Sequence, residues 1–181
     1  MCTICTLTIE FAVEHPDALA VAVATREAIE TGPLPELDPQ SEIDMAQSRH
    51  NATVLLTTIQ QRIEQVLSAS RLARLPDFYV LMIESRTWGH FHPTLGGFDA
   101  NANPSPPRVA PDENGIRDNI LVMSQAAAEE LIHGRLPFER ALEMGVAVVD
   151  APGTDAQTIR SALIVAYPLE QFSDFVCTEV A

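Results

Sequence analysis

The 181-residue chain contains no lysine, and its eleven basic residues are all arginines. This absence excludes a lysine nucleophile, Schiff-base chemistry and the lysine of a phosphate-binding P-loop. Basic residues are also few beside 25 carboxylates, which gives a formal net charge of −14. Such a surface repels phosphate backbones and anionic membranes, so we expect no nucleic-acid partner. A protein partner is expected to present a basic face.

Long apolar runs are also absent: none approaches about 18 residues, so no membrane span is expected. The first residues, Met-Cys-Thr-Ile-Cys, lack the positive region and the apolar run of a signal peptide. The cysteines number three, and an odd count argues against a disulfide framework. Together these features predict a reduced, bacterial-type cytoplasmic protein.

Material for a core is plentiful, because 46% of the residues are apolar. A chain of this length can bury roughly 70% of the surface that it exposes when unfolded. Residues 1–44 predict an N-terminal strand and helix followed by an acidic, proline-rich linker. Residues 45–181 predict the main domain.

The strongest pattern is helical. Leu55, Ile59 and Ile63 recur at helical spacing and predict one long helix over residues 45–73. Four short apolar segments predict strands, at residues 78–84, 87–93, 119–123 and 146–150. The fold class is therefore α+β, with a small, mainly antiparallel sheet covered on one face by the long helix and the C-terminal helices. The N-terminal strand and helix are expected to extend the edge of the sheet or to mediate dimerisation.

Boundary signals place the C-terminal helices. Ser124 predicts the cap of a helix that ends at Gly134, and Pro137 opens a second short helix. Thr154 and Gln157 have the spacing of a capping box, which predicts the start of the last helix.

Cys2 and Cys5 form a Cys-x-x-Cys pair, whose two thiolates can bind one zinc or another soft metal ion. Cys177 could supply a third ligand if the termini meet, and a histidine could supply the fourth. The alternative is that Cys5 is only a small apolar residue at the start of a strand.

His90 and His92 lie two residues apart on a predicted strand, so both imidazoles point to the same side and could bind one metal ion. Trp88 shares that face. The alternative is that the neighbouring glycine and proline place both histidines in a solvated turn. His15 is expected to cap a helix.

An apolar ligand has four candidate contact residues on the same two predicted strands: Phe78, Met82, Trp88 and Phe91. Catalytic motifs are scarce, since Ser85 and Ser124 lie in no Gly-x-Ser-x-Gly frame. We therefore expect a protein that is not an enzyme.

Three segments carry a family resemblance: Asp118-Asn-Ile-Leu-Val-Met-Ser124, Gly134-Arg-Leu-Pro-Phe-Glu-Arg-Ala141 and Glu143-Met-Gly145-Val-Ala-Val-Val149. Their order, a strand, a helix, a Gly-x-Leu turn, a short helix and a last strand, resembles the C-terminal half of the sterol-carrier-protein family. With the preceding long helix, the resemblance spans about residues 45–166. It implies an apolar tunnel for lipid or another hydrophobic ligand, without catalytic residues.

These patterns favour a non-catalytic binding or accessory protein with a site for an apolar molecule or for a segment of a partner protein. One alternative is a Cys/His metal-binding accessory protein for metal trafficking or metalloenzyme assembly. Another alternative is a structural subunit of a larger complex or of a homodimer, in which the acidic surface docks on a partner.

Overall fold

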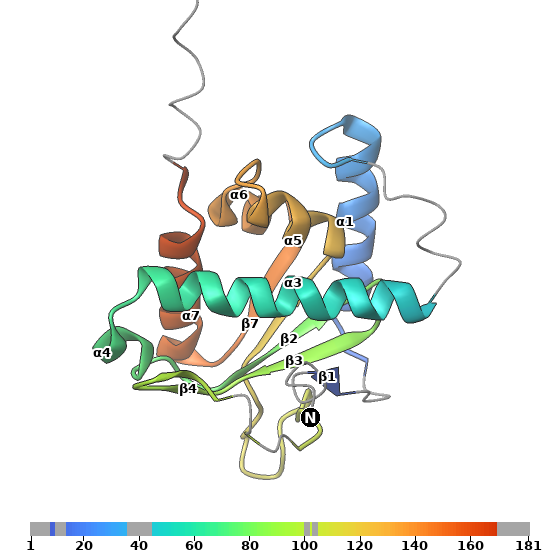
Figure 1. Cartoon of the computed structure of the whole chain (residues 1–181). Coiled ribbons are helices and arrows are strands. Elements are labelled where there is room, and N and C mark those ends of the chain that lie inside the picture. The colour runs from blue at the N-terminus through green and yellow to red at the C-terminus, as the bar shows by residue number, and fades with distance from the viewer. Residues whose placement is uncertain (1–7, 10–13, 36–44, 100–101, 103–104, 170–181) are drawn as a thin grey trace, which may run out of the picture.

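The structure is a computed structural model, and it describes residues 8–9, 14–35, 45–99, 102 and 105–169 (Figure 1). In chain order the elements are β1 (Thr8–Ile9), α1 (Ala18–Thr31), α3 (Met45–Val66), α4 (Ala69–Leu72), β2 (Phe78–Met82), β3 (Thr87–Phe91), β4 (Pro93–Thr94), β5 (Gly97–Phe98), β6 (Ile120–Met123), α5 (Gln125–Ile132), α6 (Phe138–Glu143), β7 (Ala147–Asp150) and α7 (Gly153–Ala166). No helix in these ranges combines the length and the apolarity needed to cross a membrane.

Five strands form the main sheet in the order β1-β3-β2-β6-β7. The central pair, β2 and β6, is parallel, and every other neighbouring pair is antiparallel. Strands β4 and β5 form a separate two-stranded hairpin. The predicted α+β class with a small, mainly antiparallel sheet is therefore confirmed.

One face of the sheet carries the larger core. Alternate residues of β2, among them Phe78 and Met82, point to this face, where α3, α5 and α7 cover them. Ile59 and Ile63 of α3 are fully buried there. Figure 1 shows α3 lying across the whole assembly, with α7 near one end and α1 near the other. The helical spacing that predicts α3 thus marks its buried face.

The opposite face carries a second, smaller core. Val21 of α1 belongs to this core and is fully buried in a cluster that includes Leu81 and Trp88. Strand β1 pairs with β3 at the sheet edge, as predicted. Helix α1, however, covers a face of the sheet, so the fold has three layers. The first turn of α1 thereby lies beside the end of β2.

The long helix predicted over residues 45–73 is in fact two helices. It ends at Val66, and Ser68 adopts an extended backbone (φ −65°, ψ 154°) at the N-cap of α4. Serine favours such cap positions over helix interiors. The break turns Leu72 and Leu75 into the core, where they are 3% and 7% exposed.

The three predicted starts of C-terminal helices have different outcomes. Pro137 is the N-cap of α6, as predicted. Ser124 caps α5 as predicted, and its Oγ accepts a hydrogen bond from the amide of Ala127 at 3.1 Å. The capping box predicted at Thr154 and Gln157 is wrong, because α7 begins at Gly153 and its N-cap is Pro152. Proline has no side-chain acceptor, but its fixed φ suits the entry to a helix.

Candidate functional site

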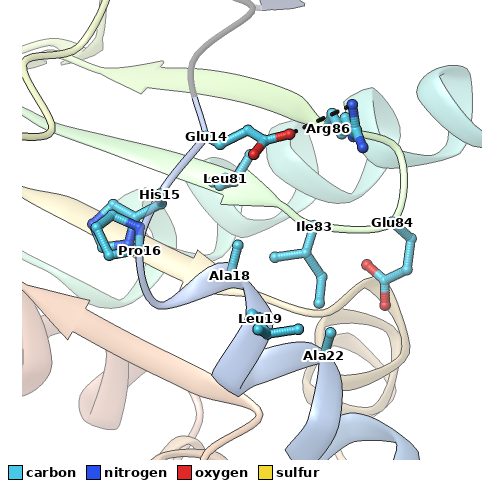
Figure 2. A pocket seen from close by; sticks show the side chains of 10 residues that line it. All are labelled: Glu14, His15, Pro16, Ala18, Leu19, Ala22, Leu81, Ile83, Glu84 and Arg86. Carbon is cyan, nitrogen blue, oxygen red and sulfur yellow. Dashed lines mark ion pairs between the residues drawn. The ribbon is translucent and has the colours of Figure 1, made fainter.

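A cavity of about 670 Å³ opens between the first turns of α1 and the end of β2 (Figure 2). Helix α1 contributes Ala18, Leu19 and Ala22, whereas β2 and the turn after it contribute Leu81 and Ile83. The two walls are about sixty residues apart in the sequence, and α1 is held there by its packing on the second face of the sheet. The volume lies within the usual range of small-molecule sites, roughly 300–1,000 Å³.

The floor of the cavity is buried and its rim is open. Leu81 on the floor is 3% exposed, whereas Leu19 on the rim is 74% exposed. The rim also holds an ion pair between Glu14 and Arg86, whose nearest atoms are 3.7 Å apart. Both side chains of that pair are exposed, so it contributes little to stability. Arg86 has a positive φ of 53°, which gives the tight turn that follows β2.

Glu84 is a partly buried acidic residue of this cavity. Its Oε2 accepts a hydrogen bond of 2.7 Å from the backbone amide of Gln125, at the N-terminus of α5. Its Oε1 is buried and finds no hydrogen-bond partner among the described residues. Figure 2 shows the carboxyl group on the side of the chain that faces Ile83 and Ala22. One oxygen is thus anchored, and the other is enclosed without a hydrogen-bond partner among the described residues.

Burial raises the pKa of Glu84 from 4.5 to about 7, because desolvation penalises the carboxylate. The nearby backbone amides of Gln125, of Glu84 itself and of Ala126 oppose this rise, and the charge of Glu129 adds to it. Near neutral pH the group therefore exists as both acid and carboxylate. Serine, threonine and cysteine are absent from the described residues that line the cavity.

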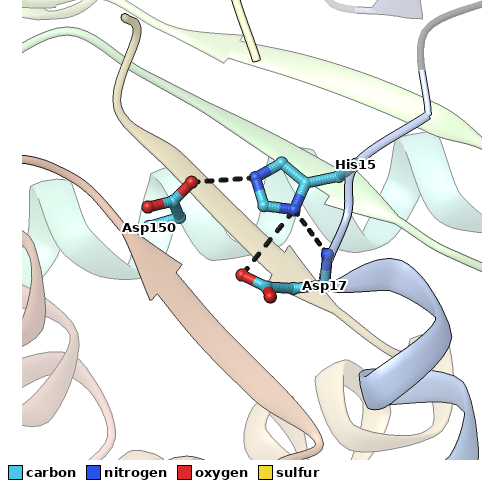
Figure 3. Close-up of side chains that lie close together, drawn as sticks. All are labelled: His15, Asp17 and Asp150. Atoms are coloured by element: carbon cyan, nitrogen blue, oxygen red, sulfur yellow. Dashed lines mark hydrogen bonds and ion pairs between the residues drawn. The ribbon is translucent and has the colours of Figure 1, made fainter. Parts of the chain in front are cut away.

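Beside the cavity, His15 joins α1 to the edge strand β7 (Figure 3). Its side chain is 1% exposed, and its Nε2 lies 3.1 Å from Oδ2 of Asp150. Its Nδ1 accepts a hydrogen bond of 3.1 Å from the amide of Asp17. Because Nδ1 is an acceptor, Nε2 carries an N–H group and donates a hydrogen bond to Oδ2 of Asp150. The prediction that His15 caps the helix is wrong, because α1 begins at Ala18 and its N-cap is Asp17. His15 precedes the cap and makes a tertiary contact with Asp150 instead.

His15, Asp17 and Asp150 also have the composition of a metal site, since their ligand atoms lie within 4.8 Å of one another. Oδ2 of Asp150, however, also accepts a hydrogen bond from Arg117. A cation would have to displace the donors at Nδ1 and Oδ2 and would face the positive charge of Arg117. The contacts of these three residues instead fit a structural role, in which His15 links the start of α1 to β7.

The structure brings the two predicted metal-ligating histidines side by side. The rings of His90 and His92 are stacked, with centroids 6.0 Å apart. Burial lowers the pKa of His90, whose Nδ1 has no partner within the described part of the chain. His92 bonds instead to Asp77 at 2.8 Å through Nδ1. Cys2, Cys5 and Cys177 lie outside the described residues, so the metal site stays a prediction.

The four residues predicted to contact an apolar ligand do not share one surface. Phe78, Met82 and Phe91 belong to the larger core, whereas Trp88 belongs to the core on the opposite face. Each is at most 1% exposed, and none of them lines the cavity beside α1. Trp88 and His90 do share a face, as predicted, because both rings contact Tyr79.

The sequence patterns missed Glu84 and the cavity. One local signal was present: a carboxylate directly follows the apolar run Phe78–Ile83 and precedes a short turn. Its burial depends on α1 and α5, which no local pattern places. No protein-family model, curated protein or solved structure matches the chain.

Proposed function

We propose that the chain is a non-catalytic binding protein for a small, largely apolar molecule, held in the cavity between α1 and the end of β2. One observation carries this proposal: an apolar cavity of about 670 Å³ that contains a buried carboxyl group with an unpaired oxygen. Small-molecule sites combine these two features, apolar walls and few well-placed polar groups.

The chemistry of the walls supports the same ligand class. Leu19, Leu81 and Ile83 offer aliphatic surface, and burial of apolar surface gives about 25 cal/mol per Å². An unoccupied site leaves Leu19 exposed to water, which is unfavourable for so large an apolar side chain. The sterol-carrier resemblance, which stays a prediction, implies a hydrophobic ligand as well.

The test uses the neutral fluorescent probe N-phenylnaphthylamine, whose emission rises in apolar surroundings. We expect saturable binding to the full-length chain, with one site per molecule. Ala22 lies on the exposed side of α1 and lines the cavity, so Ala22→Phe should fill the cavity without disturbing the core. The expected result is a loss of probe binding by about tenfold or more.

Ala20→Phe is the matched control. Ala20 is also exposed on α1, but it does not line the cavity, so this variant should bind the probe like the wild type. Circular dichroism of both variants checks that α1 remains folded. Equal binding by the two variants, or no saturable binding by the wild type, would refute the proposal.

A further inference from the structure

The geometry of Glu84 points to one chemical class of ligand. We propose that the cavity selects molecules with an apolar body and a protonated amine at one end, whose N–H group donates to Oε1 of Glu84. This inference rests on the proposed function, because it names the ligand of the same cavity.

The carboxyl group is held in place before a ligand binds. The amide of Gln125 fixes Oε2 at 2.7 Å, and α5 in turn is fixed by its cap at Ser124. Oε1 is left buried without a partner among the described residues. A buried acceptor without a partner costs free energy, and a donor from a ligand recovers it. A charged donor recovers more than a neutral one, since charge-assisted hydrogen bonds are stronger.

The charges around the cavity also favour a cation. Glu129 on α5 adds negative charge near Glu84. Arg86 at the rim is paired with Glu14, so its positive charge is partly neutralised. His15, the remaining titratable group of the lining, directs its ring nitrogens to Asp150 and to the amide of Asp17. The net charge of −14 attracts cationic ligands from solution and repels anionic ones.

The protonation of Glu84 couples to such a ligand. A pKa of about 7 leaves the empty site partly protonated at neutral pH. An ammonium group beside the carboxyl group favours the carboxylate, so an amine that binds near neutral pH releases a proton to solvent. A neutral alcohol of the same length has no such effect.

The experiment compares three ligands with one tail: n-octylamine, n-octanol and octanoate. Each displaces N-phenylnaphthylamine from the wild-type chain and from Glu84→Gln, which keeps an oxygen for the amide of Gln125 and loses the charge. Against the wild type above neutral pH, octylamine should bind about tenfold tighter than octanol, and octanoate should bind weakest. In Glu84→Gln the difference between amine and alcohol should fall to about twofold or less.

A second measurement does not depend on the variant. Carbon-13 NMR of the Glu84 carboxyl group should show its pKa fall when octylamine binds and stay unchanged when octanol binds. Equal affinity of amine and alcohol for the wild type, or an amine preference that survives in Glu84→Gln, would overturn the inference. If the probe still binds and Ala22→Phe still abolishes binding, the proposed function stands without it. If the probe does not bind at all, both fail.

Discussion

Glu84 follows β2 in the sequence and lies against the N-terminus of α5 in space. Its carboxyl group is therefore both desolvated and hydrogen-bonded. Desolvation is the larger effect, so its pKa lies near 7 in the folded chain instead of at 4.5. The folded state thus binds this proton more tightly than the unfolded state. The contribution of Glu84 to stability is most favourable below about pH 4.5 and declines as the pH rises to about 7.

Glu84→Gln should remove this decline. As the pH rises from 4.5 to 7, the wild type should lose on the order of 3 kcal/mol of unfolding free energy relative to the variant. Urea unfolding at a series of pH values measures the difference between the two curves. Glu113→Gln, at an exposed loop position, is the control and should run parallel to the wild type. Parallel curves for Glu84→Gln would contradict the assignment.

Gly89 is a second residue whose role follows from its surroundings. A Cβ at this position would lie 3.0 Å from Cδ2 of Leu56, a side chain that is fully buried. Gly89→Ala should therefore destabilise the protein by about 1–3 kcal/mol through overpacking between α3 and β3. Gly96→Ala is the control, because the nearest atom to its Cβ is 3.9 Å away. Equal urea midpoints for the two variants would count against this close approach.

At the scale of the elements, the start of α5 positions Glu84, because the cap residue Ser124 directly precedes the amide of Gln125 that bonds to Glu84. Ser124→Ala should cost about 1 kcal/mol of stability, since the buried amide of Ala127 loses its acceptor. Thermal unfolding gives the comparison with Ser161→Ala, an exposed serine inside α7. The latter should be neutral or slightly stabilising. A Ser124→Ala variant as stable as Ser161→Ala would disprove the cap.

The elements differ in how much of them could be predicted. Helix α5 was predictable because the acceptor of its cap belongs to the residue that starts it. The break at Ser68 was not, because the apolar spacing continues through Leu67 and Leu72 and only their tertiary contacts decide the direction of the chain. The start of α7 was misplaced because Pro152 competes with Thr154 as a helix start.

At the scale of the whole molecule, His15 and Asp150 connect two elements that lie 135 residues apart in the sequence. His15→Ala should destabilise the fold by about 1–3 kcal/mol, because it removes a buried hydrogen bond and the contact that positions α1 beside the sheet. It should also weaken binding of N-phenylnaphthylamine. His50→Ala, at an exposed position of α3, is the control for urea unfolding and should behave like the wild type. Equal unfolding free energies of the two variants would show that the contact between His15 and Asp150 does not stabilise the fold.

The cavity could not be predicted from the sequence, because its two walls lie far apart along the chain. Its walls come from residues 14–22 and 81–86, and hydrophobic periodicity assigns each segment a buried side without saying what covers it. The sequence indicated the apolar content and the absence of catalytic motifs. Side-chain alternation along the strand does place Trp88 and Phe91 on opposite faces, so their grouping in one ligand site conflicted with the strand geometry.

The position of α7 has a consequence for biosynthesis. Helix α3 emerges from the ribosome before α7, but Ile63 and its neighbours share a core with Ile159 and Leu163 of the last described helix. Arg62 also donates to the carbonyl of Ala166. A nascent chain that has not yet released residues 153–166 therefore leaves the apolar side of α3 exposed, and the core closes only after α7 has emerged from the ribosome.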